Sequence, residues 1–111
     1  MNNRVPITTH ILDLVKGKPA VGVTVSLYSE DKRISVGKTN GDGRVEEWQQ
    51  PFEINAGRYR LEFDVGLWFA SKGESTFYED VQISFRIENT SEHYHVPLLL
   101  SPYGYSTYRG S

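Results

Sequence analysis

The chain has 111 residues, a length typical of one folded domain, so we expect a single domain over residues 1–111. Its formal net charge of −2 gives no reason to expect nucleic acid or an anionic membrane as a partner. It contains no cysteine, which excludes disulfides, thiolate catalysis and cysteine-ligated zinc. The N-terminal residues lack the apolar core of a secretion signal and no run reaches transmembrane length, so we expect a cytoplasmic protein.

Apolar and polar residues alternate with a period of two, which is typical of strands with one buried and one exposed face. The first such segment is "PITTHILDL", where Thr8 and His10 share a face. Turn-forming stretches separate the segments, and "NGDGR" at residues 40–44 is a strong reversal because Asn-Gly and Asp-Gly tolerate positive φ. The clearest later segments are residues 21–27, 59–65, 81–87 and 94–100.

One stretch, "LWFASKGESTFY" at residues 67–78, lacks this alternation and predicts a short helix. The rest of the chain predicts about eight short strands at the spacing of an all-β sandwich. Pro97 has no N–H to donate, so we expect its strand at a sheet edge, or its missing donor away from a partner strand. The predicted fold is therefore an all-β sandwich with one short helix.

The chain has three histidines, His10, His93 and His95, and the last two project from one face of their strand. They admit three interpretations. They are ordinary histidines at a sheet surface, or they bind a catalytic zinc ion with an open position. In the third interpretation, a histidine activates water without a metal while arginines hold an anionic substrate.

Two arginines stand out as candidates for that last role. Arg44 closes the tight turn and Arg109 lies in the C-terminal sequence "YGYSTYRGS". Arg44 could equally begin a strand with its charge in water. Tyr103, Tyr105 and Tyr108 are hard to bury in so short a chain, and a final strand with aromatic residues on both faces suggests burial against another subunit.

Three motifs together give the chain a family resemblance. "THILD", "GDGR" and "HYHVPLLLSPYGYSTYRGS" resemble the 5-hydroxyisourate hydrolases, also called transthyretin-like proteins, and the similarity covers essentially the whole chain. The terminal Tyr-Arg-Gly-Ser is the most specific part, since transthyretin, the hormone carrier with the same fold, lacks it. The resemblance implies an eight-stranded sandwich of two antiparallel sheets, assembled as a homotetramer, a dimer of dimers with its active sites in the channel between them.

The resemblance also implies a reaction and its residues. The reaction is hydrolysis of the cyclic amide of 5-hydroxyisourate to 2-oxo-4-hydroxy-4-carboxy-5-ureidoimidazoline, on the purine-degradation route from urate to allantoin, with no cofactor or metal. His93 is a neighbour of the site and has no catalytic assignment. Position by position, the catalytic residues are His10, Arg44 and His95, and the substrate-binding residues are Tyr108, Arg109, Gly110 and Ser111.

Three other functions stay open at this point. A transthyretin-like carrier of small ligands would share the fold but would not need this set of site residues. A zinc hydrolase built on His10, His93 and His95 predicts bound metal. A purely structural sandwich module predicts neither turnover nor a specific ligand.

Overall fold

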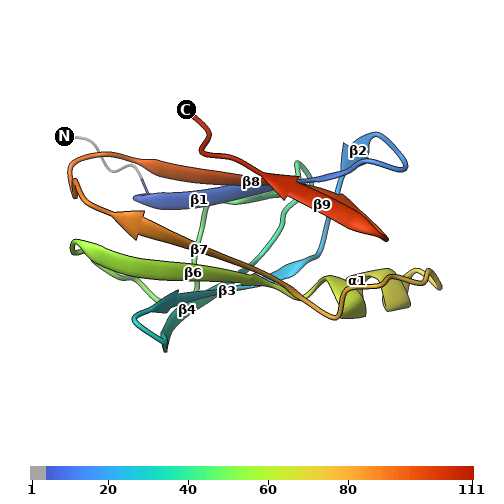
Figure 1. Ribbon diagram of the computed structural model, residues 1–111, viewed down its shortest axis with the longest axis horizontal. Helices are drawn as coiled ribbons and strands as arrows, with labels where there is room; N and C mark the ends of the chain where they lie inside the picture. Colours follow the sequence, from blue (N-terminus) through green and yellow to red (C-terminus); the bar gives the residue numbers. More distant parts are fainter. Residues whose placement is uncertain (1–4) are drawn as a thin grey trace.

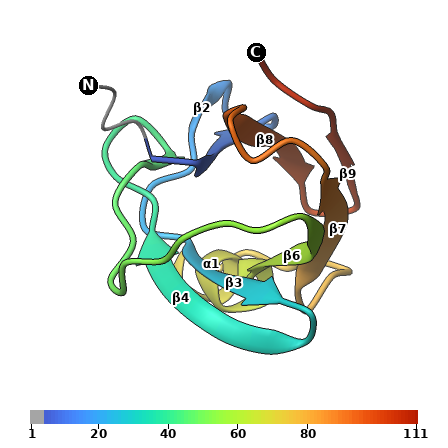
Figure 2. The same ribbon diagram turned by 90° about the vertical axis from the view of Figure 1, so that its left-hand side faces the viewer.

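The computed structural model describes residues 5–111, in which two β-sheets lie face to face (Figure 1 and Figure 2). The first sheet has the strand order β2-β1-β8-β9, with β5 pairing with β1, and the second has the order β4-β3-β6-β7. The first sheet consists of β1 (Ile7–Asp13), β2 (Lys18–Pro19), β5 (Arg44–Val45), β8 (Tyr94–Ser101) and β9 (Gly104–Thr107). The second consists of β3 (Thr24–Ser29), β4 (Lys32–Lys38), β6 (Gly57–Phe63) and β7 (Val81–Ile87).

The core lies between the sheets and confirms the predicted alternation. On β8, every second side chain is fully or nearly fully buried, including Leu98 and Leu100. The pattern fails at two ends of the predicted segments. Val21 is half exposed because β3 begins only at Thr24. Val65 is buried, but as the first residue of a helix and not as the last of a strand.

The predicted helix is α1 (Val65–Ser71), which lies at one end of the second sheet (Figure 1). It buries Trp68 and Phe69, and the indole N–H of Trp68 donates a 2.8 Å hydrogen bond to the carbonyl of Val21. Within residues 5–111, no helix has the length and apolar character needed to cross a membrane.

One strand pair differs from the expected antiparallel arrangement. Strands β1 and β8 run parallel over seven residue pairs, from Ile7 opposite Tyr94 to Asp13 opposite Leu100. The chain reaches β8 only after passing through the second sheet, so no hairpin turn fixes the direction in which the two strands meet. Of the nine strands in the described part of the chain, two are only two residues long, and the prediction of about eight short strands is close.

Pro97 does not lie on an edge strand, because β8 has β1 on one side and β9 on the other. Of the two placements expected for Pro97, the edge strand is wrong, and the other, a missing donor that faces no ladder partner, agrees with the structure. The ladder between β8 and β9 runs from Ser101 to Leu98, opposite Thr107, and resumes as a single bridge between His95 and Gly110. Since Pro97 has no N–H to donate, its position coincides with the gap in the ladder. Beyond β9, the C-terminal segment, residues 108–111, therefore continues as a loosely paired strand.

Candidate active site

The candidate site is on the outer face of the first sheet, opposite to the core. On β1, Thr8 and His10 alternate with buried residues and so point outward. The strand register places Thr8 opposite His95 of β8, and His10 opposite both Pro97 of β8 and Arg44 of β5. Three strands that are distant in the sequence thus bring two histidines and an arginine to one place.

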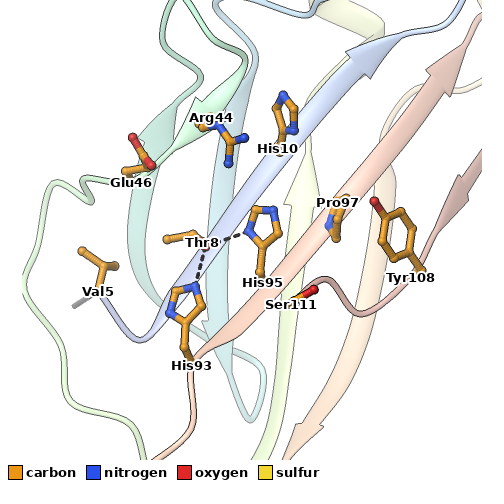
Figure 3. Close-up of a pocket in the computed structure, with 10 residues that line it drawn as sticks. All are labelled: Val5, Thr8, His10, Arg44, Glu46, His93, His95, Pro97, Tyr108 and Ser111. Atoms are coloured by element: carbon orange, nitrogen blue, oxygen red, sulfur yellow. Dashed lines mark hydrogen bonds between the residues drawn. The ribbon is translucent and has the colours of Figure 1, made fainter.

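These side chains surround a cavity of about 530 Å³ (Figure 3). Sticks from β1, β5 and β8 form its base and one side in the figure, and residues of the C-terminal segment lie on the other side. A cavity of this size can hold a small heterocyclic molecule. Its lining consists of Val5, Thr8, His10, Arg44, Glu46, His93, His95, Pro97, Tyr108 and Ser111.

His95 is held by a hydrogen bond at the floor of this cavity. Its Nδ1 atom lies 2.8 Å from the hydroxyl oxygen of Thr8, and the same oxygen lies 2.9 Å from Nε2 of His93. Burial lowers the pKa of His95 below the usual histidine value, and the nearby positive charge of Arg44 lowers it further. His95 is therefore neutral at physiological pH, the form in which an imidazole can accept a proton.

Arg44 is presented by the tight turn that the sequence predicted. The side-chain oxygen of Asn40 accepts hydrogen bonds from the backbone N–H groups of Asp42 and Arg44, at 2.9 and 3.1 Å. Gly43 has φ of +74°, and a Cβ there would lie 2.6 Å from the carbonyl oxygen of Ile11 on β1. The turn thus presses against β1, which fixes Arg44 beside His10.

The C-terminal segment reaches the cavity because it is pinned to β8. The N–H of Gly110 donates a 2.8 Å hydrogen bond to the carbonyl of His95. A Cβ on Gly110 would lie only 2.6 Å from Cδ2 of the His95 ring, so the close approach requires glycine. Tyr108 and Ser111, on either side of this contact, both line the cavity.

Arg109 and Gly110 are the predicted site residues that do not line this cavity, and Arg109 is directed away from it. Its guanidinium group forms a 2.8 Å ion pair with Glu92 and lies 4.5 Å from the ring centre of Tyr94. It also donates a 3.3 Å hydrogen bond to the carbonyl of His93. Arg109 instead lines a second, more apolar cavity of about 270 Å³ beside β7.

Five cavity-lining residues were not among the predicted site residues: Val5, Thr8, Glu46, His93 and Pro97. The signal for Thr8 and His93 was present in the alternation, since each lies two positions before a predicted catalytic histidine on the same strand face. No sequence feature identified Glu46, which reaches the cavity only because β5 pairs with β1.

The zinc interpretation would require the three histidines to converge as ligands. Within residues 5–111, no group of three or more His, Asp or Glu side chains is arranged to hold a metal ion. His93 and His95 lie side by side with ring centres 6.4 Å apart, both turned toward Thr8 (Figure 3).

Comparison with known proteins agrees with this fold. The fold is a transthyretin-type sandwich: the solved structure of sea bream transthyretin in complex with thyroxine has a TM-score of 0.84 and 32% identity, covering 96% of this chain and 95% of its own. The structure of Klebsiella pneumoniae 5-hydroxyisourate hydrolase has a TM-score of 0.85 and 43% identity, covering 95% of this chain and 98% of its own.

Sequence comparison then identifies the family. The 5-hydroxyisourate hydrolase of Salmonella typhimurium is 45% identical over 109 residues, which cover 95% of this chain and 80% of that protein. Residues 7–110 match the HIUase/Transthyretin family. The chain belongs to this family.

Proposed function

We propose that this chain hydrolyses 5-hydroxyisourate to 2-oxo-4-hydroxy-4-carboxy-5-ureidoimidazoline in purine degradation. The observation that carries the proposal is the convergence of His10, Arg44 and His95 on one cavity, in a chain whose relatives are named for this reaction. The reaction opens a cyclic amide: a water oxygen attacks the carbonyl carbon, the ring C–N bond breaks, and the leaving nitrogen takes a proton. It needs a base, a stabiliser of negative charge and a shaped cavity, all of which protein side chains can supply.

The two histidines supply the proton transfer in this proposal. His95 is neutral at physiological pH because its pKa is lowered by burial and by the positive charge of Arg44. Its neutral ring can accept a proton from the attacking water and return it to the leaving nitrogen. His10, on the neighbouring strand of the same face, orients the water or shares this role.

Arg44 supplies the charge stabilisation. Its guanidinium group lies in the cavity beside His10, where it can bind the carbonyl oxygen under attack. Negative charge develops on that oxygen as the water adds, and a fixed cation beside it stabilises it. This role is electrostatic, so the arginine needs position and charge only.

The C-terminal segment completes the substrate-binding surface. In the proposal, Tyr108 packs against the flat substrate ring, and Ser111 offers its hydroxyl. Gly110 permits the close approach to His95. The family resemblance assigns Arg109 to substrate binding. Its guanidinium group is directed toward Glu92, so in the proposal Arg109 supports substrate binding by holding the C-terminal segment in place.

Assembly into a homotetramer in the cytoplasm is also part of the proposal. Tyr103, Tyr105 and Tyr108 are all exposed on or beside the β9 edge, which has no partner strand on its outer side within the described chain. Exposed aromatic residues along a strand edge favour burial against a second copy. Light scattering with size-exclusion chromatography tests this point directly.

The experiment that tests the reaction generates 5-hydroxyisourate from urate with urate oxidase and follows the decay of its absorbance. We expect this chain to accelerate the decay, with and without a chelator. Arg44→Gln should lose most of the acceleration, while Arg33→Gln, at an exposed position on the second sheet, should not. If a chelator abolished the acceleration, the result would support a metal-dependent hydrolase and contradict the proposal.

The competing function is a carrier of small ligands, which the likeness to sea bream transthyretin brings into consideration. A carrier would bind the substrate or a related heterocycle without accelerating its decay. Calorimetric titration with a stable urate analogue, combined with no turnover, would favour that function.

A further inference from the structure

The hydroxyl group of Thr8 connects two imidazole rings on the cavity floor (Figure 3). Its oxygen lies 2.8 Å from Nδ1 of His95 and 2.9 Å from Nε2 of His93. The contacts follow from the backbone: Thr8 is the register partner of His95, and His93 lies two residues earlier on the same face. The pairing of β1 with β8 therefore holds Thr8 beside His95, and His93 immediately precedes β8.

A hydroxyl group has one proton, so this chain of hydrogen bonds can run in only two directions when both rings are neutral. In one direction, His95 donates Nδ1–H to Thr8 and Thr8 donates its proton to His93. The Nε2 atom of His95 then carries a lone pair. In the other direction, His93 donates to Thr8 and Thr8 donates to His95, whose Nε2 then carries a proton. The direction of the chain thus decides whether His95 presents a base or an acid at Nε2.

We propose that Thr8 and His93 are positioning residues for His95: they hold its proton on Nδ1, so that Nε2 is free to accept a proton from the attacking water. The inference rests on the hydrolase function proposed above. Neither residue touches the reacting atoms in this scheme. Thr8 fixes the ring and its tautomer, and His93 accepts the hydrogen bond from Thr8.

The same chain can carry charge away from His95 after the first proton transfer. When Nε2 of His95 takes a proton from water, the ring becomes an imidazolium ion. Its Nδ1 proton can move to the Thr8 oxygen as the Thr8 proton moves to Nε2 of His93. His95 is then neutral with Nε2–H, and His93 holds the positive charge. As Nε2–H passes to the leaving nitrogen, both protons return and the chain is reset.

The surrounding charges favour such an arrangement. His95 faces Arg44 from β5, His93 beside it and His10 from β1, and each of them lowers its pKa when positively charged. Moving a positive charge from His95 to His93 takes it one ring further from Arg44 along the stacked pair. Glu46 lines the same cavity and is the acidic side chain among its described lining residues.

The test compares Thr8→Val, which keeps the shape but removes the hydroxyl, with Thr8→Ser, which keeps the hydroxyl. We expect Thr8→Val to lower kcat between roughly 10-fold and 100-fold, part of the 10²–10⁴ that general acid–base catalysis contributes, and Thr8→Ser to restore most of it. Thr24→Val, on the second sheet, is the control for loss of a strand hydroxyl. Melting temperatures of the Thr8 variants close to that of the wild type would exclude unfolding as the cause of a lower kcat.

A second measurement needs no turnover. The ¹⁵N shifts of His95 report which ring nitrogen carries the proton. In His93→Phe, Thr8 loses its acceptor and should donate to His95, so the proton should move from Nδ1 to Nε2. Wild-type kcat in Thr8→Val, or an unchanged His95 tautomer in both Thr8→Val and His93→Phe, would overturn the inference. Absence of turnover in the wild type would instead contradict the proposed function. The ¹⁵N shifts would still show the direction of the hydrogen bonds between His95, Thr8 and His93.

Discussion

The backbone N–H of Gly110 donates a 2.8 Å hydrogen bond to the carbonyl of His95. This bond joins the second-last residue of the chain to a strand residue whose side chain lies at the cavity floor. The bond bridges the gap that Pro97 leaves in the β8–β9 ladder. The position of the C-terminal segment and the position of the His95 ring are therefore coupled, and changes in one should appear in the other.

Gly110→Ala should lower activity without unfolding the protein. The added Cβ would lie 2.6 Å from the His95 ring and 3.2 Å from Cγ of Pro97, so the C-terminal segment has to move away. Because Gly110 makes only an isolated bridge at the sheet edge, we expect little change in melting temperature. We expect kcat/KM to fall at least about tenfold, because small misplacements of positioned groups cost large factors in rate.

Gly104→Ala is the matched control on the same strand. A Cβ there would meet its nearest atom, the Ser101 hydroxyl oxygen, at 3.7 Å, an ordinary contact. It should leave kcat/KM close to that of the wild type. Equal losses in Gly104→Ala and Gly110→Ala would show that the close approach to His95 has no special part in activity.

Glu92→Gln should loosen the C-terminal segment. It removes the carboxylate that pairs with Arg109 at 2.8 Å, and both side chains are about half exposed, so the melting temperature should hardly change. The amide of Gly110 should nevertheless exchange with solvent deuterium faster, because the neighbouring residue is no longer anchored. Glu53→Gln, at another exposed position, should leave that exchange rate unchanged.

The pH dependence of this ion pair has a definite sign. The hydrogen bond from Arg109 lowers the pKa of Glu92 below its usual value. The pair is therefore complete above the unfolded-state pKa of a glutamate and is lost as pH falls through the lower folded-state pKa. Gly110 protection that persisted unchanged through that acid range would show that the ion pair does not hold the segment.

The buried faces of the strands could be predicted from the sequence because alternation with a period of two has one physical cause, burial of one sheet face. It identified Leu98 and Leu100 correctly and also placed His93 and His95 on a common outer face. The turn before Arg44 was equally readable, since Gly43 adopts the positive φ that favours glycine.

The pairing of distant strands could not be predicted from local pattern. The parallel register of β1 with β8 joins Thr8 to residues 85 and 87 positions later, and it creates the hydrogen bonds to His93 and His95. The direction of Arg109 depends on Glu92, which the chain brings near only by folding β9 back along β8. Such contacts depend on tertiary structure, so the sequence could name candidate histidines and arginines but not the contacts between them.

Gly43→Ala should destabilise the fold and displace Arg44. Alanine at φ of +74° is strained by about 1–3 kcal/mol, and its Cβ would also meet the Ile11 carbonyl oxygen at 2.6 Å. We expect a lower melting temperature together with lower kcat/KM, measured on the same preparation. Gly41→Ala, two residues earlier in the same turn, has nothing within 4 Å of its Cβ and should change neither quantity greatly. Equal melting temperatures for the two variants would contradict this account.

Arg44→Gln should raise the pKa of His95. Burial is the main cause of its lowered pKa and the charge of Arg44 is the next, so removing that charge should reverse part of the shift. In the wild type, the contribution of neutral His95 to stability is present above the unfolded-state pKa and is lost as pH falls through the lower folded-state pKa. In Arg44→Gln the folded-state pKa is higher, so this loss should be complete at a higher pH than in the wild type. An NMR titration of the His95 ring protons measures the pKa without requiring turnover, and Arg33→Gln is the control for loss of a distant cation. A His95 pKa equal in Arg44→Gln and Arg33→Gln would mean that Arg44 does not act on the imidazole electrostatically. In that case the acid limb of the pH–rate profile of Arg44→Gln should also be the same as that of the wild type.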